Sequence, residues 1–101
     1  MFKQADALGG INTLTMHLPN PVTGGDFYDT SGDAVAAVLP GGARHSDLTA
    51  RLDRVADAVA GARRPDGTLI PVILRPWHER NGDWFWWGAG HATDQQYVEL
   101  F

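Results

Sequence analysis

The side chains best suited to chemistry lie near the carboxyl end of the chain, where a glutamate is surrounded by aromatic residues. Glu79 is one of only two glutamates among the 101 residues, and three of the four tryptophans lie within Trp84–Trp87. Aromatic faces bind sugar rings and exclude water, which favours the protonated form of a carboxyl group and suits a general acid. A neighbouring arginine or histidine favours the ionised form, and the sequence leaves open which influence is larger.

Other chemistries lack a residue that they require. The pair His78-Glu79 resembles the start of a zinc-binding helix, but position 82, where the second histidine would stand, is glycine. The run Gly88-Ala89-Gly90 follows no strand directly and lacks the third glycine of a dinucleotide-binding loop. The chain has no cysteine and no Gly-x-Ser-x-Gly motif, which excludes thiolate chemistry and disfavours a serine hydrolase. The sequence therefore predicts neither a metal nor a cofactor.

The overall composition is that of a folded protein with an acidic balance. Hydrophobic residues make up 44% and charged residues 20% of the chain, and the net charge is −4, which is ordinary for a globular protein. The acidic balance argues against a nucleic-acid partner. No apolar run approaches the roughly 20 residues of a membrane helix, and the first residues show no apolar signal segment.

Structural explanations compete with a functional site for most of these residues. Clustered tryptophans more often form a core or an interface than a ligand platform, and a glutamate after a strand is more often a surface residue. The isolated histidines His17, His45 and His91 are also typical of structural roles.

The hydrophobic pattern predicts two strands and a helix between them. The strands are Ile11–Met16, rich in β-branched residues, and Leu69–Leu74, whose continuous apolar run is typical of a strand buried on both faces. Pro71 is unusual in such a strand. The helix covers Ser46–Arg64 and ends at a turn over residues 65–67.

Capping residues and short segments complete the pattern. Ser46 is the expected cap of the long helix, and Asp47 suits its first turn. A second capped helix begins at Thr93 and continues to the last residue. Shorter helical segments are predicted at Lys3–Leu8 and Asp33–Leu39.

This order of elements implies a parallel sheet of the α/β class. Strands joined through a helix are parallel, and functional residues in such folds gather at the carboxyl ends of the strands. His17 follows the first predicted strand, and Arg75, His78 and Glu79 follow the second. We therefore expect the functional site at this edge of the sheet.

Residues 75–88 read Arg-Pro-Trp-His-Glu-Arg-Asn-Gly-Asp-Trp-Phe-Trp-Trp-Gly. This segment closely resembles the acid/base region of glycoside hydrolase family 26. Thr15–Pro21 resembles the end of the preceding strand in the same family, whose members are mainly endo-β-1,4-mannanases. The resemblance implies a fragment of a (β/α)₈ TIM barrel, a fold of about 250 residues. Residues 1–101 would hold about two of its eight units, β-α-β plus the start of the next helix, and no complete domain.

The resemblance also implies roles for individual residues. Glu79 matches the general acid/base of a retaining glycosidase, and His78 matches the residue that orients the acid/base and reaches the sugar. The nucleophile, a glutamate after a later strand, lies outside this chain, so we expect the isolated chain to be inactive. The positions that match substrate-binding residues are His17, Arg75, Trp84 and, for distal stacking, Phe27 or Tyr28.

The function implied is hydrolysis of β-1,4-mannosidic bonds in mannan, galactomannan or glucomannan, by an enzyme that is secreted or held at the cell surface. Some family members cleave β-1,3-xylan or mixed-linkage β-glucan, which stay open as substrates. A second hypothesis is a non-catalytic carbohydrate-binding fragment that uses the Trp84–Trp87 cluster. A third is a structural fragment in which Trp86 and Trp87 are core residues.

Overall fold

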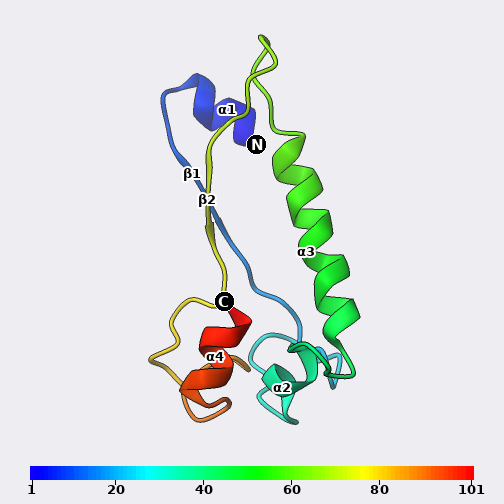
Figure 1. The fold of residues 1–101 in the computed structure, drawn as a ribbon. Helices are drawn as coiled ribbons and strands as arrows, with labels where there is room; N and C mark the ends of the chain where they lie inside the picture. The colour runs from blue at the N-terminus through cyan, green and yellow to red at the C-terminus, as the bar shows by residue number, and fades with distance from the viewer.

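Two short parallel strands lie in the middle of the molecule, and a long helix stands apart from them (Figure 1). The computed structural model describes residues 1–101 and measures 46 × 26 × 24 Å. In chain order the elements are α1 (Phe2–Ala7), β1 (Asn12–Thr15), α2 (Ala34–Val38), α3 (His45–Ala60), β2 (Val72–Arg75) and α4 (Asp94–Leu100). The order confirms the predicted strand–helix–strand unit followed by a helix.

The two strands pair in parallel from Asn12 opposite Val72 to Thr15 opposite Arg75. Both therefore point toward the end of the molecule where α2 and α4 lie (Figure 1). The strands are shorter than predicted, and Pro71 lies just before the first paired residue of β2. The conflict between a proline and a hydrogen-bonded strand is thereby removed, since the missing N–H is not part of the ladder.

Helix α3 forms where predicted, but both of its ends differ from the prediction. It begins at His45 after Arg44, and no side chain caps it, so the assignment of Ser46 as the cap is wrong. Asp47 does lie in the first turn. The helix ends at Ala60 rather than Arg64, because residues 62–70 double back through backbone hydrogen bonds and leave the helical path.

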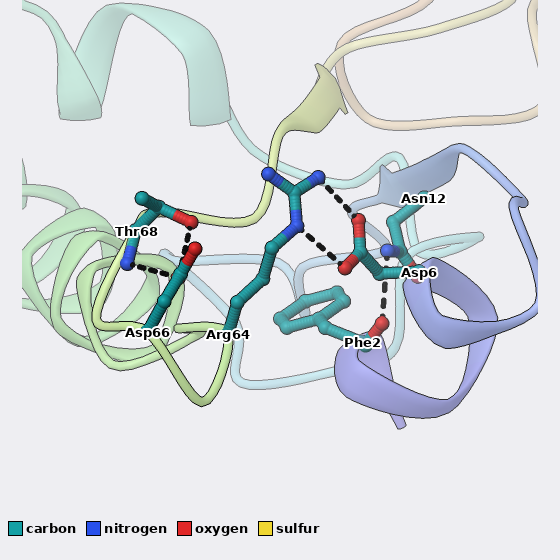
Figure 2. Close-up of polar contacts among 6 residues, drawn as sticks. All are labelled: Phe2, Asp6, Asn12, Arg64, Asp66 and Thr68. Carbon is teal, nitrogen blue, oxygen red and sulfur yellow. Dashed lines mark hydrogen bonds and ion pairs between the residues drawn. The ribbon is translucent and has the colours of Figure 1, made fainter.

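Side-chain hydrogen bonds hold the elements together at the amino-terminal ends of the two strands (Figure 2). Arg64 donates to both carboxylate oxygens of Asp6, at 2.8 and 2.7 Å, and so ties α1 to the segment before β2. Arg64 holds the pKa of Asp6 below its ordinary value, chiefly through this hydrogen bond. Asn12 donates to the Phe2 carbonyl at 3.1 Å. These contacts fix the start of β1 relative to the start of β2.

The hydrophobic core lies at the carboxyl ends of the strands and not on the sheet. It joins α2 and the first turn of α3 to the aromatic segment that follows β2, and α4 packs against it. Thr93 caps α4 in a capping box with Gln96, as the sequence predicted for Thr93. The buried members are Ala34, Val35, Val38, Leu39, Leu48, Trp77, Phe85, Trp86 and Trp87.

Strand β2 is exposed in this chain, so the prediction that it is buried on both faces is wrong here. The side chain of Ile73 is 55% exposed and that of Leu74 is 46% exposed. The physical reason is that a sheet of two strands leaves both outer edges, and much of both faces, without neighbours. None of the four helices has the length and apolar character that crossing a membrane requires.

This exposure predicts the behaviour of the chain in solution. We expect the isolated 101-residue chain to self-associate as its concentration rises, because Ile73 presents apolar surface beside open strand edges. Ile73→Lys should weaken this association, and sedimentation velocity over a concentration series measures it. Ala58→Lys, on the exposed side of α3, is the matched control. A parent chain that sediments as a monomer at every concentration contradicts the prediction.

Candidate active site

The parallel pairing of the strands brings His17 and His78 together. Beyond the last paired residues, Thr15 and Arg75, the two imidazoles meet with their Nε2 atoms 3.2 Å apart. The rings are nearly perpendicular, with centroids 4.6 Å apart. His78 is buried and His17 is exposed. Two residues 61 positions apart in the sequence thus form one polar pair at the predicted edge of the sheet.

His78 has its pKa shifted by its surroundings. Burial lowers its pKa below the ordinary value, and the charges of His17 and Arg75 lower it further, while Glu79 opposes them. Its Nδ1 atom is buried without a hydrogen-bond partner. An unpaired acceptor is tolerated better than an unpaired N–H donor, so when both imidazoles are uncharged we assign the proton of His78 to Nε2, which donates to Nε2 of His17.

The carboxyl group of Glu79 is exposed and has one oxygen engaged. The indole N–H of Trp84 donates to Oε2 of Glu79 at 3.0 Å. Because the indole is only a donor, Oε2 is occupied as an acceptor, and an acidic proton on this group would lie on Oε1. A Cβ atom on Gly82 would overlap the Trp84 ring, so the ring can lie this close to the backbone only because residue 82 is glycine. The side chain of Trp84 is 43% exposed and presents its ring to solvent.

The backbone that carries Glu79 is strained. Trp77 has φ of 48° and Glu79 has φ of 57°, and they are the only residues other than glycine in the left-handed region. Each such residue costs of order 1–2 kcal/mol. Backbone strain of this kind persists only where surrounding contacts hold it, and it is common at functional sites.

Phe27 and Tyr28 lie next to the histidine pair. The ring of Phe27 is 4.8 Å from that of His17, and Tyr28 stacks on the buried Phe85 at 5.5 Å. Tyr28 is 59% exposed, whereas Phe27 is partly buried against the core. Of the two predicted stacking residues, Tyr28 is therefore the more accessible.

The Trp84–Trp87 cluster does not form a single sugar-binding platform. Trp86 is 2% and Trp87 is 0% exposed, and Phe85 between the tryptophans is 3% exposed. The indole N–H of Trp86 donates to the Leu18 carbonyl, and that of Trp87 donates to the His78 carbonyl, both at 2.8 Å. The interpretation of Trp86 and Trp87 as core is confirmed. The carbohydrate-binding hypothesis cannot use the whole cluster, because only Trp84 is accessible, and binding of a carbohydrate through Trp84 stays a prediction.

Arg75 ends β2 opposite Thr15, and its side chain is exposed. No ion pair joins it to Glu79, and its charge reaches the site through its influence on His78. The predicted role of Arg75 in supporting the catalytic carboxylates stays a prediction.

Asn20 shapes the site and was not singled out from the sequence. It is 1% exposed; its amide donates to the carbonyls of Asp29 and Ser31, at 2.7 and 2.9 Å, and its Oδ1 accepts from the N–H groups of Val22 and Thr23. All four of these hydrogen bonds hold the loop that carries Phe27 and Tyr28. The one available signal was an asparagine flanked by two prolines.

Two other histidines act as structural residues, as predicted. His45 donates to the Val38 carbonyl at 2.8 Å, and His91 donates to the Asp83 carbonyl at 2.7 Å. No group of three histidine, aspartate or glutamate side chains lies close enough together to hold a metal ion. A cavity of about 300 Å³ between residues 18–24 and α3 contains none of the predicted catalytic side chains.

The sequence and fold match a known family over nearly the whole chain. A model of glycosyl hydrolase family 26 matches residues 3–101. The chain belongs to this family. Its similar proteins include a mannan endo-1,4-β-mannosidase from Bifidobacterium adolescentis, which is 50% identical over 97 residues, and one from Bacillus subtilis, which is 35% identical over 98 residues.

Solved family 26 structures superpose closely on this chain. An endo-β-1,4-mannanase from Cellulomonas fimi gives a TM-score of 0.95 at 56% identity over 98% of this chain. A family 26 β-mannanase from Bacteroides ovatus gives a TM-score of 0.90 at 44% identity over 94% of this chain.

This family 26 chain spans only part of the length of its relatives. It covers 10% of the Bifidobacterium protein, 26% of the Bacillus protein and 22% of the Cellulomonas chain. It is a fragment of a (β/α)₈ barrel. That residues 1–101 form no complete domain stays a prediction.

The close superposition allows a segment exchange. Residues 1–101 can replace the matching segment of the Cellulomonas mannanase, which then supplies the other barrel units. We call this chimera the exchange protein and use it where a test needs the complete barrel.

The histidine pair gives a titration prediction. Because the charge of His17 lowers the pKa of His78, His17→Asn should raise that pKa toward the ordinary value of about 6.5 without reaching it, since burial is the larger cause. NMR titration of ¹³C-labelled histidines in the exchange protein measures the change. His45→Asn is the matched control, because His45 bonds to α2 and not to the pair. An unchanged His78 titration in His17→Asn would count against the electrostatic coupling.

Proposed function

We propose that this chain supplies the proton-transferring half of the active site of an endo-acting retaining glycoside hydrolase. The enzyme cleaves β-1,4-mannosidic bonds, with Glu79 as its general acid/base. The observation that carries the proposal is the geometry of Glu79: an exposed carboxyl group at the end of a parallel strand, with Oε2 engaged by Trp84 and Oε1 free. A group held in this way can present a proton to a bound substrate in one direction.

The reaction divides into two steps on this scheme. In the first, Oε1–H of Glu79 gives its proton to the glycosidic oxygen as the C–O bond breaks, while a carboxylate outside this chain attacks the anomeric carbon. In the second, Glu79 as carboxylate takes a proton from water, whose oxygen displaces the enzyme carboxylate and leaves the sugar with its original configuration. The proton that leaves Glu79 is thereby restored.

The surroundings of Glu79 suit a polysaccharide chain. The exposed rings of Trp84 and Tyr28 flank the site and offer apolar faces for sugar rings. His17 presents a polar edge beside them, next to the buried His78, whose pKa burial lowers. We propose mannan, galactomannan or glucomannan as the substrate, supported by the names of the relatives. A polymer of this size implies a secreted or cell-surface enzyme.

The decisive variant is Glu79→Ala in the exchange protein. We expect kcat/KM for mannohexaose to fall about 10²–10⁴-fold, because proton donation to a poor leaving group is lost. For 2,4-dinitrophenyl β-mannobioside, whose leaving group needs no proton, the loss should stay below about tenfold. Added azide should restore turnover and give a β-mannosyl azide, since this anion attacks the glycosyl–enzyme without a general base.

The matched control uses the only other glutamate of the chain. Glu99→Ala, on the exposed side of α4, should leave kcat/KM for both substrates and the effect of azide on turnover unchanged. Equal losses on both substrates in Glu79→Ala would contradict the acid/base assignment, and an α-configured azide would contradict retention.

A further inference from the structure

Three consecutive backbone carbonyls in the strained segment each accept a hydrogen bond. The Tyr97 hydroxyl donates to the Trp77 carbonyl at 2.6 Å, the Trp87 indole donates to the His78 carbonyl at 2.8 Å, and the Gly82 amide donates to the Glu79 carbonyl at 3.0 Å. The two residues with left-handed backbone, Trp77 and Glu79, lie within this run. Each peptide group of the segment is therefore fixed in orientation.

We propose that Tyr97 is a positioning residue for Glu79, acting through its hydroxyl on the backbone at Trp77. The proposal rests on the proposed role of Glu79 as the acid/base. Of the three donors, only Tyr97 lies outside residues 77–87, because it belongs to α4 and stands 20 positions from Trp77. The Tyr97 hydrogen bond is also short, and only the hydroxyl makes it.

The position of the hydroxyl is set by how α4 begins. Thr93 accepts from the Gln96 amide at 3.1 Å, and the Gln96 side chain accepts from the Thr93 amide at 2.9 Å, which fixes the first turn. Arg80, directly after Glu79, donates to the Ala92 carbonyl at 3.0 Å and to Asp94 at 3.1 Å. The start of α4 is thus tied to the segment that carries Glu79.

Arg80 also covers the ring of Tyr97. Its guanidinium carbon lies 5.3 Å from the ring centroid, at the distance of a cation–π contact. The ring is therefore held by Arg80 and by packing against the core, and a phenylalanine would keep both contacts. Replacement of Tyr97 by Phe isolates the hydroxyl.

Loss of this hydroxyl releases the carbonyl of Trp77. The left-handed conformation of Trp77 is intrinsically unfavourable, and one of the hydrogen bonds that hold it is then missing. The segment therefore relaxes toward the ordinary backbone region. A shift of Trp77 moves Glu79 two residues later. A displacement of about 1 Å at a catalytic group costs up to about 10²-fold in rate.

The test compares two leaving groups in the exchange protein. We expect Tyr97→Phe to lower kcat/KM for mannohexaose about 10–100-fold and that for 2,4-dinitrophenyl β-mannobioside less than about threefold. A merely structural role would lower both equally, because it reduces the amount of folded enzyme and not proton transfer. Thr49→Val removes another hydrogen bond from a hydroxyl to a carbonyl, the one to His45 on α3 at 2.9 Å. This variant should change kcat/KM for neither substrate.

Glu79→Ala, assayed alongside, separates this proposal from the one on which it rests. If Glu79→Ala shows the leaving-group difference and Tyr97→Phe does not, the positioning role of Tyr97 is overturned and the acid/base assignment stands. If Glu79→Ala shows no difference either, both fail, because there is then no acid/base at this position to hold.

A structural measurement tests the same proposal without turnover. Crystal structures of the exchange protein and its Tyr97→Phe variant should differ in the backbone at Trp77 and in the place of the Glu79 carboxyl group. Unchanged positions of both, with an unchanged hydrogen bond from Trp84 to Glu79, would overturn the proposal.

Discussion

The parallel pairing of β1 with β2 is the constraint on which the rest of the molecule depends. A parallel ladder places the carboxyl ends of both strands at one edge, and its register sets which residues meet beyond that edge. The meeting of His17 and His78 follows from the alignment of Thr15 with Arg75. A slip of one residue would turn every side chain of one strand to the opposite face and separate the pair.

Hydrogen bonds join the core to the candidate site. Trp86 and Trp87 are buried, and a buried indole N–H needs an acceptor. The acceptors are the carbonyls of Leu18 and His78, one in the segment after each strand. Packing of the core therefore fixes the two segments that carry the polar residues, so stability and site geometry are coupled at this end of the fold.

The strained backbone at Trp77 and Glu79 is the counterpart of that rigid packing. Left-handed residues other than glycine are unfavourable, and here the surrounding donors on α4 and on the aromatic segment offset the cost. The exposed Glu79 is consequently held by buried contacts behind it. An acid/base group gains from such rigidity, because proton transfer depends steeply on orientation.

Much of this arrangement was predictable from the sequence, and the exceptions have physical causes. The strand–helix–strand order and Thr93 as a cap were predictable from period and composition, because these depend on local residue types. The cap at Ser46, the helix end at Arg64 and the double burial of β2 failed, since helix boundaries and strand exposure depend on what packs nearby.

By itself, the sequence determined which residues could act: a glutamate and histidines at strand ends, among aromatic side chains. Only the tertiary structure decided that Trp84 is free while Trp86 and Trp87 are buried, although all three lie within four positions. It also decided that Asn20 and Tyr97 organise the site through backbone carbonyls. Such contacts join residues distant in the chain to groups that every residue carries, so no local pattern of side chains announces them.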